Sequence, residues 1–173
     1  MLHEYVIEGE NLVLRPLRYF DLERLRSWRN QDHIRSFFVH REPISSEQQV
    51  RWFQNYLKRM DDMMFIIVEK KRYQPIGAAA LYHIQQVRAE FGRFMIGEPA
   101  ARGKGYGMES LLSICRFAFN QLGLRFIRLE VLEENKRAIA IYQRCGFMPA
   151  GVTNNQGRTL LQMELSQENC RQM

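Results

Sequence analysis

The sequence predicts one mixed α/β domain that spans residues 1–173. Segments with apolar residues at helical spacing alternate with short β-prone runs, in the order β-α-α-β-β-β-α-β-α-β-β. No repeat, low-complexity tract or linker divides the chain, and its 46% hydrophobic content suits one substantial core. We therefore expect an α/β (α+β) fold with a mostly antiparallel, seven-stranded sheet flanked by four helices.

The first strand and helix are predicted before residue 31. Residues 12–17 alternate as a strand. Asp21 is a residue type that caps helices, and apolar residues at helical spacing follow it: Leu22, Leu25 and Trp28. Asn30 is expected to end this helix.

A second helix is predicted after Pro43. Either Ser45 or Ser46 can cap it, with Gln48 or Gln49 completing a capping box. Its buried stripe is expected to consist of Val50, Phe53 and Leu57.

The middle of the chain predicts an antiparallel meander. Its three apolar, β-prone runs cover residues 64–68, 76–84 and 89–96, and charged or glutamine-rich turns separate them.

The second half predicts two helices and three strands. The first helix has the apolar residues Met108, Leu111, Leu112, Cys115 and Phe119, with Gly123 at its expected C-terminal cap. A strand over residues 126–131, a helix over 135–145 and two strands over 148–153 and 158–165 follow. The tail beyond Ser166 is expected to fray.

Composition limits the function classes. A net charge of +6 and a pI near 9.5 favour a polyanionic ligand, but there is no nucleic-acid motif and no long basic run. The three cysteines show no metal or redox spacing, which favours a reduced cytosol and predicts no metal. Residues 1–10 lack an apolar signal region and no stretch is long enough to span a bilayer. We expect a cytoplasmic protein that binds neither membrane nor nucleic acid.

A glycine-rich loop is the strongest chemical signal. Arg102, Gly103, Lys104, Gly105, Tyr106 and Gly107 lie between a predicted strand and a helix, so backbone N–H groups should converge at the helix start. The glycines let a phosphate approach the backbone, and Arg102 and Lys104 add positive charge. The motif is neither a dinucleotide fingerprint nor a Walker loop. A flexible glycine turn is the plainer alternative.

The helix over 135–145 places a tyrosine on its inner face. Ala138, Ile141, Tyr142 and Cys145 share that face, so Tyr142 is expected to point inward. An inward tyrosine is more often a core residue than a catalytic one.

The two segments together resemble the Gcn5-related N-acetyltransferase (GNAT) superfamily. The pattern Arg102-x-x-Gly105-x-Gly107 comes first, and Asn135 and Tyr142-x-x-Cys145-Gly146-Phe147 follow. The resemblance implies the GNAT acyl-CoA N-acyltransferase fold, with a sheet splayed after the strand that ends near Gly97. It also implies acetyl-CoA as the donor and favours a homodimer.

The same resemblance implies how the donor is held. Met95 and Gly97 would give backbone hydrogen bonds to pantetheine, the loop from Arg102 to Gly107 would hold the pyrophosphate, and Asn135 would bond the pantetheine arm. Tyr142 would face the thioester sulfur.

The expected reaction is direct attack of a neutral amine on the acetyl carbonyl, with backbone donors near Met95 to Gly97 stabilising the oxyanion. Tyr142 would protonate the leaving thiolate. Glu90, Glu130 or a water chain would take the amine proton, and Glu130 occupies a position that resembles the base of ribosomal-protein N-terminal acetyltransferases. Cys145 is interpreted as a packing residue.

The acceptor is expected to contact the first half of the chain. The candidate substrate-binding residues are Trp28, Arg29, Asn30, Arg35 and Trp52. Together with Ile34, Phe53 and the segment from Ile44-Ser45 to Gln49, these residues form a pattern that resembles the sugar-nucleotide N-acetyltransferases of the pseudaminic acid type, which implies a nucleotide sugar with a free amine as acceptor. Ordinary helix packing explains each aromatic residue equally well. A protein N-terminal acetyltransferase, a polyamine acetyltransferase and a non-catalytic binding module remain alternatives.

Overall fold

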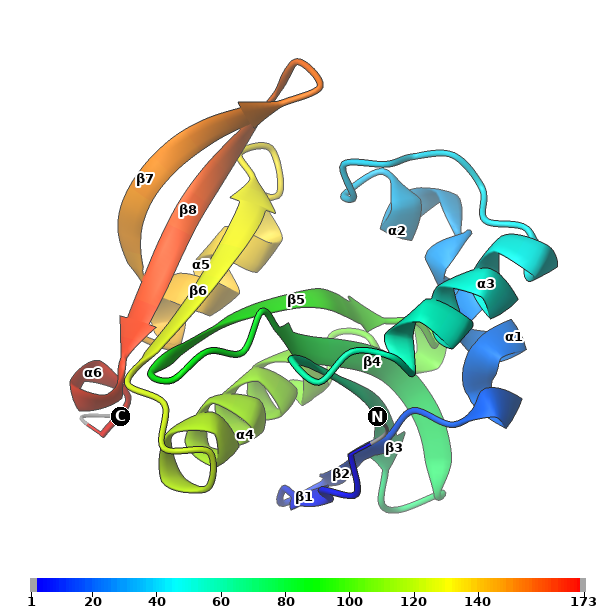
Figure 1. The fold of residues 1–173 in the computed structure, drawn as a ribbon, viewed down its shortest axis with the longest axis horizontal. Helices are drawn as coiled ribbons and strands as arrows, with labels where there is room; N and C mark the ends of the chain where they lie inside the picture. Colours follow the sequence, from blue (N-terminus) through cyan, green and yellow to red (C-terminus); the bar gives the residue numbers. More distant parts are fainter. Residues whose placement is uncertain (1–2, 172–173) are drawn as a thin grey trace.

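The computed structural model describes residues 3–171, which form one eight-stranded sheet with helices on both faces (Figure 1). The strand order is β1-β2-β3-β4-β5-β6-β8-β7. The strands are β1 (Ile7–Glu8), β2 (Leu12–Pro16), β3 (Asp62–Glu69), β4 (Gln74–Tyr82), β5 (Arg88–Ile96), β6 (Phe126–Leu132), β7 (Met148–Asn155) and β8 (Arg158–Ser166). The helices are α1 (Leu22–Arg29), α2 (Asp32–Arg35), α3 (Ser46–Tyr56), α4 (Tyr106–Asn120), α5 (Lys136–Arg144) and α6 (Gln167–Arg171). Two 3-10 turns cover Tyr19–Asp21 and Pro99–Ala101.

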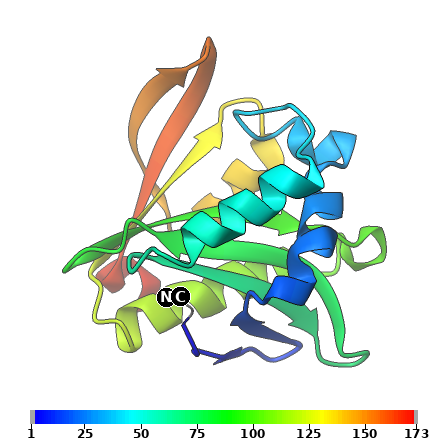
Figure 2. The same cartoon turned by 45° about the vertical axis from the view of Figure 1, so that its right-hand side comes forward.

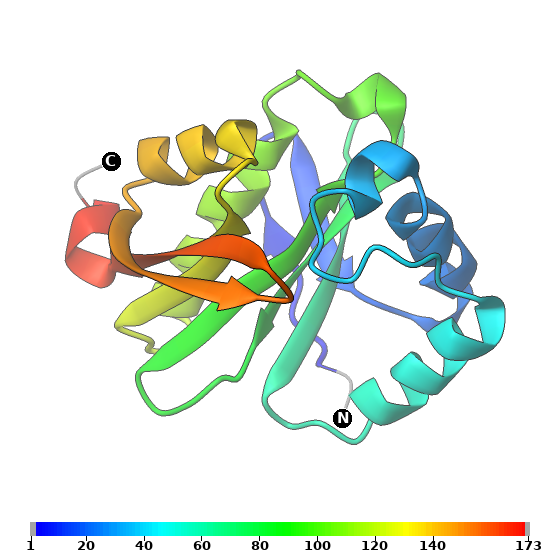
Figure 3. The ribbon, with the colours of Figure 1, turned by 90° about the horizontal axis from the view of Figure 1, so that it is seen from above.

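The sheet divides between β5 and β6. These two strands are the parallel pair in a sheet whose other pairings are antiparallel, and they pair only where Arg88–Glu90 lies beside Phe126–Arg128. Beyond this short contact β5 continues to Ile96 and the strands diverge, as Figure 3 shows from above. The predicted splay is confirmed, and it opens the sheet at the strand that precedes the glycine-rich loop.

Two apolar cores cover the two faces of the sheet. On one face, α4 and α5 pack over β-strand residues that include Phe65, Phe91 and Ile127. On the other face, α1 and α3 cover a core that includes Met64, Ala78 and Met95 (Figure 2). Because side chains alternate along a strand, neighbours on β5 and β6 face opposite cores. The gap between the diverging strands therefore lies between the sheet face covered by α4 and α5 and the face covered by α1 and α3. We call these the α4 face and the α1–α3 face.

The seven predicted strands and four predicted helices are present. Sequence reasoning missed β1, α2 and α6, which are too short to show a clear period. The tail that was expected to fray forms α6 instead.

Ser45 is confirmed as the cap of α3, because its side chain accepts from the Gln48 N–H, and the Gln48 side chain completes the capping box. The predicted buried stripe of α3 is wrong in part. Leu57 is exposed, and the buried face of α3 consists of Gln49, Phe53 and Tyr56.

Asp21 does not cap α1, since its carboxylate is bound by the guanidinium of Arg15 and by the Arg18 N–H. A charged neighbour on β2 binds this carboxylate in place of the helix N–H groups.

Within residues 3–171, no helix combines the length and apolarity needed to cross a membrane. The cytoplasmic location stays a prediction.

Candidate active site

A cavity of about 680 Å³ runs through the splay. Its walls come from β5 and β6, from the N-terminal end of α4, from the length of α5, and from α2 and the loop after it. Residues from both sequence motifs line it, together with residues of both sheet faces. The cavity therefore joins the glycine-rich loop to the face covered by α1 and α3.

The start of α4 offers backbone donors to this cavity. The first hydrogen bond of the helix runs from the Glu109 N–H to the Gly105 carbonyl, 3.1 Å, so the helix has no partner for the N–H groups of Tyr106, Gly107 and Met108. No side chain caps the helix. Gly103 and Gly105 have φ values of +76° and +85°, which glycine adopts without strain. The open amides therefore lie at the positive end of the helix dipole, a geometry that suits an anion, and we call this loop the cradle.

Arg102 lines the cavity but is bound to the protein. Its Nε donates to the Ile96 carbonyl at 3.1 Å, and its Nη2 donates to Gln31 Oε1 at 2.7 Å and to the Gly97 carbonyl at 2.9 Å. It ties the loop to β5 and α2, in addition to the charge that the sequence predicted. Lys104 is exposed and lies outside the lining.

Tyr142 reaches the cavity from α5. Its ring packs against Phe91 and Phe147, with centroids 6.3 and 5.9 Å away, and only 7% of the residue is exposed. Burial raises the pKa of Tyr142 far above its usual value, with smaller contributions from Tyr82 and Cys145. The hydroxyl has no hydrogen-bond partner among the described residues. Tyr142 is therefore a neutral phenol with a free donor at the cavity wall.

Asn135 caps α5, because its Oδ1 accepts from the Ala138 N–H at 3.2 Å. Its Nδ2 has no partner within the part of the chain that the structure describes, and the residue lines the cavity. One end of the side chain thus holds the helix, and the other end faces the cavity.

The two candidate bases lie on the α1–α3 face of the sheet. Glu130 on β6 lines the cavity and accepts from Gln162 Nε2 at 3.0 Å. Glu90 on β5 lies outside the lining and is 3.0 Å from His83 Nδ1. The geometry favours Glu130 over Glu90, because only Glu130 borders the cavity.

The predicted backbone partners on β5 differ from one another. Met95 lines the cavity. Gly97 does not, and its N–H donates to the Ile76 carbonyl at 2.8 Å while its carbonyl accepts from Gln31 and Arg102. These bonds leave the backbone of Gly97 without a free donor for pantetheine. Its lack of a side chain makes room for Trp28, whose Cγ would lie 2.1 Å from an added Cβ.

The five predicted substrate residues do not line the cavity. Trp28 is buried and donates to Glu98, so ordinary helix packing is the correct interpretation for it. Asn30 donates to and accepts from the backbone of Ile44, which fixes the loop before α3. Trp52 stacks on Tyr56 at 5.6 Å between ring centroids.

The two arginines in this set hold the same loop. Arg29 stacks on Phe38, 3.9 Å from the ring centroid, and donates to the His40 carbonyl. Arg35 pairs with Asp32 and donates to the Arg41 carbonyl. These residues shape the loop and do not border the cavity.

Sequence reasoning missed the residues that border the cavity on this side. They are Tyr82, Arg93, Phe37, Phe38 and Val39. No motif marks them, and most come from α2 or the irregular segment after it. Tyr82 is largely buried, and burial together with the negative charges of Glu90 and Glu130 raises its pKa to about 12.

One arginine joins the rim of the cavity to the β7–β8 hairpin. Arg158, at the start of β8, donates to the carbonyls of Phe38 at 2.8 Å and Ser36 at 3.0 Å, and it pairs with Glu134. Arg41 pairs with the same carboxylate at 3.3 Å. The loop after α2, the turn before α5 and the hairpin are thereby held together.

Cys115, Cys145 and Cys170 lie in the core of the α4 face, all as free thiols. Burial raises the pKa of Cys145 to about 11, so this thiol is not activated as a nucleophile. The packing interpretation of Cys145 agrees with its position.

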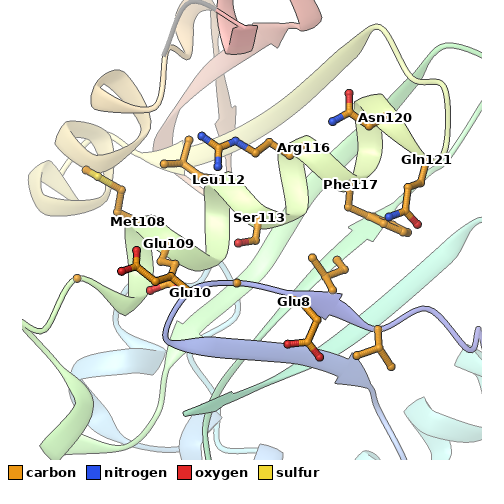
Figure 4. A pocket seen from close by; sticks show the side chains of 14 residues that line it. Glu8, Glu10, Met108, Glu109, Leu112, Ser113, Arg116, Phe117, Asn120 and Gln121 are labelled. Carbon is orange, nitrogen blue, oxygen red and sulfur yellow. The ribbon is translucent and has the colours of Figure 1, made fainter. Parts of the chain in front are cut away.

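A second hollow of about 750 Å³ lies between α4 and the β1–β2 turn (Figure 4). Three carboxylates line it, those of Glu8, Glu10 and Glu109, with one guanidinium, that of Arg116. Glu109 accepts from the N–H and Nδ2 of Asn11, which fixes the turn to the helix. Gly105 and Met108 border both this hollow and the cavity in the splay, but the three carboxylates make this hollow a poor site for phosphate.

This fold and cavity define the acetyltransferase class, and comparison with known proteins agrees. Residues 11–148 match the acetyltransferase (GNAT) domain, so the chain belongs to the GNAT family of acetyltransferases.

The chain is similar to proteins whose names differ in the substrate they state. Spermidine N(1)-acetyltransferase of Vibrio cholerae is 27% identical over 143 residues, covering 83% of this chain and 82% of that protein. The crystal structure of this organism's spermidine N-acetyltransferase with CoA and spermine has a TM-score of 0.82 at 25% identity, covering 93% and 98% of the two chains.

Acetyltransferase PseH of Campylobacter jejuni is 25% identical over 127 residues, covering 73% of this chain and 76% of that protein. The uncharacterized protein MJ1062 of Methanocaldococcus jannaschii is 26% identical over 141 residues, covering 81% of this chain but 28% of that longer protein.

Proposed function

We propose that the protein transfers the acetyl group of acetyl-CoA to a primary amine. One observation carries this proposal: the open amides at the start of α4 and the unpartnered hydroxyl of Tyr142 border the same cavity. The amides suit a diphosphate and the phenol suits a leaving thiolate, which are the two ends of a coenzyme A thioester.

The residues present fit this donor. The amides of Tyr106, Gly107 and Met108 would hold the pyrophosphate, in a loop that has no Cβ at residues 103, 105 and 107. Asn135 Nδ2 and the β5 wall at Met95 would contact the pantetheine arm. Arg137 and Arg144 of α5 add positive charge to the lining. When bound, the thioester supplies an activated acetyl group.

The chain supplies a proton donor and a proton acceptor. The amine nitrogen bonds to the acetyl carbon as the carbon–sulfur bond breaks, Tyr142 donates a proton to the departing sulfur, and the proton that the nitrogen then loses restores the Tyr142 hydroxyl. An acceptor that arrives as ammonium must first lose a proton, and Glu130 is the carboxylate that borders the cavity. Tyr142 belongs to the α4 face and Glu130 to the opposite face, so acid and base approach from the two sides of the splay.

For the acceptor, we propose a nucleotide-linked sugar with a free amine. The lining includes Glu130 as its one carboxylate, against the guanidinium groups of Arg93, Arg102, Arg137 and Arg144. This charge suits an acceptor that bears phosphate better than one with several ammonium groups.

A polyamine is the second candidate acceptor. It is favoured by the similarity to the spermidine N-acetyltransferase of Vibrio cholerae, whose structure contains CoA and spermine. A peptide N-terminus is a third candidate, and the similarity of the chain to that class was inferred from the sequence alone.

The test is an acceptor panel with purified protein and acetyl-CoA, read as free thiol release. The panel contains a uridine-diphosphate-linked 4-amino-4,6-dideoxy sugar, spermidine, spermine and peptides with free N-termini. Turnover of the sugar nucleotide at least about tenfold above the others is expected, since one charge-assisted contact gives that preference. Preferred turnover of spermidine would replace the sugar nucleotide by a polyamine as the proposed acceptor. The absence of thiol release with every amine would refute acetyl transfer.

A further inference from the structure

A cationic side chain is fixed on the α1–α3 face of the cavity. Arg93 lies on β5 beyond the short stretch that pairs with β6, and it lines the cavity. Its guanidinium carbon is 4.6 Å from the ring centroid of Tyr82 and 5.7 Å from that of Trp52. The cation is thus held between an aromatic residue of the sheet and one of α3.

The hydrogen bonds of Arg93 leave part of its donor set open. Nη1 and Nη2 donate to the two oxygens of Asp62, at 2.7 and 2.9 Å. A guanidinium has five N–H donors, and the described residues take only these two. Asp62 also lies 3.6 Å from Nε of Arg59, so two cations share one buried carboxylate. The charge of Arg93 is therefore only partly neutralised.

The backbone at Arg93 is strained. Its φ of +49° is in the left-handed region, which a residue with a long side chain seldom adopts. The β4–β5 register shifts nearby, between Ala78 and Ala80. Strain of this kind costs about 1–3 kcal/mol and is often kept at functional sites. Here it accompanies a cation placed in the cavity wall.

Arg93 and Glu130 place opposite charges on the same cavity. Ala89, Phe91, Leu129 and Val131 belong to the α4-face core, so Glu90 and Glu130 face the α1–α3 side with Tyr82. Electrostatic interactions of Tyr82 with both Arg93 and Glu130 influence its pKa, which places the two charges near one side chain. An acceptor with an amine at one end and an anion at the other would match this pair.

We propose that Arg93 selects acceptors that carry an anionic oxygen group, such as a nucleoside diphosphate, and disfavours polycations. The three open N–H groups bind phosphate oxygens, and the positive charge repels the additional ammonium groups of a polyamine. This inference rests on the proposed function and names the feature that sets its acceptor class.

The chain contains a matched control for Arg93. Arg15 binds both oxygens of Asp21 at 2.7 Å, and its side chain is 26% exposed beside a carboxylate that is 0% exposed. Arg93 is likewise 26% exposed beside a carboxylate that is 2% exposed. Arg15 lies outside the cavity lining. Arg15→Met therefore removes an equivalent buried ion pair without touching the proposed subsite.

The experiment is calorimetric titration of the whole protein, first with coenzyme A and then, at saturating coenzyme A, with uridine diphosphate or spermidine. Coenzyme A fills the cradle, so uridine diphosphate reports on the acceptor side. We expect Arg93→Met to weaken uridine diphosphate binding about 10- to 100-fold and Arg93→Lys to weaken it less. Arg15→Met should bind as wild type, and spermidine should bind Arg93→Met more tightly than wild type.

Several outcomes would overturn the inference. They are the absence of uridine diphosphate binding to wild type, equal affinities in Arg93→Met and Arg15→Met, and tighter binding of spermidine than of uridine diphosphate by wild type. Failure of the proposed function gives a different result: coenzyme A does not bind, or the acceptor panel releases no thiol. The uridine diphosphate titration still tests Arg93 when coenzyme A binds but the acceptor panel releases no thiol.

Discussion

Replacing Tyr142 by phenylalanine should separate catalysis from folding. The hydroxyl has no partner among the described residues, so its loss breaks no hydrogen bond of the protein, and the ring keeps its contacts with Phe91 and Phe147. We expect the free energy of unfolding to change by less than about 1 kcal/mol. Loss of a general acid lowers kcat by about 10²-fold or more, equivalent to about 2.7 kcal/mol of activation free energy.

Tyr56→Phe is the matched control for this variant. Tyr56 is also buried, but its hydroxyl accepts from the Met64 N–H at 3.1 Å. The control should lose about 1 kcal/mol, or about 2–4 °C in Tm, while kcat stays within about twofold. The assays are thiol release under saturating acetyl-CoA and thermal unfolding. A Tyr142→Phe enzyme that keeps more than about a third of the wild-type kcat would refute the role of Tyr142 as general acid.

The remaining predictions concern the cradle, β5, the base and a buried histidine. Gly105→Ala places a side chain at φ +85°, so unfolding should show a loss of about 1 kcal/mol and kinetics a raised KM for acetyl-CoA; an unchanged KM would contradict the cradle. Gly97→Ala directs a Cβ at the Trp28 ring, 2.1 Å from its Cγ, and should cost about 1–3 kcal/mol in denaturant unfolding, whereas a neutral result would contradict this packing. Glu130→Gln should lower kcat/KM at neutral pH and recover as the acceptor amine deprotonates at higher pH; a constant ratio to wild type across pH would exclude Glu130 as the base. Burial lowers the pKa of His3, so its contribution to stability is present above the usual histidine pKa of about 6.5 and is lost as pH falls through the lower folded value; His3→Phe should flatten this acid limb of the unfolding curve.

The order of elements and the uncapped start of α4 after the glycines were predictable from the sequence because both depend on local chemistry. The periodic apolar residues of α4 and the glycines before it act within a few residues of one another. The Ser45 cap is local in the same way. Asp21 shows the limit of this reasoning, because a cap prediction from residue type does not foresee that Arg15 on a neighbouring strand binds the carboxylate.

The α1–α3 side of the cavity was not predictable from the sequence because it depends on long-range placement. Trp28, Arg29, Asn30 and Arg35 carry the residue types that recognise nucleotides, but the fold uses them to hold the loop before α3 or to pack against Gly97. Arg93, in contrast, has no motif, and its position follows from a left-handed residue and from a carboxylate 31 residues away in the sequence. The register of the strands, the backbone strain at Arg93 and the path of the loop after α2 determine which residues line this side of the cavity.

The bonds of Arg158 have an evolutionary consequence. Its guanidinium joins segments that are up to 122 residues apart, and β7 beside it is mostly exposed. The two cores involve Phe38 of the loop after α2 and Leu161, Met163 and Leu165 of β8, but neither contains a residue of β7. Changes in the hairpin and in the loop after α2 can therefore reshape the entrance for acceptors while donor binding and folding persist. A family that keeps one donor and diversifies its acceptors can do so by varying this rim.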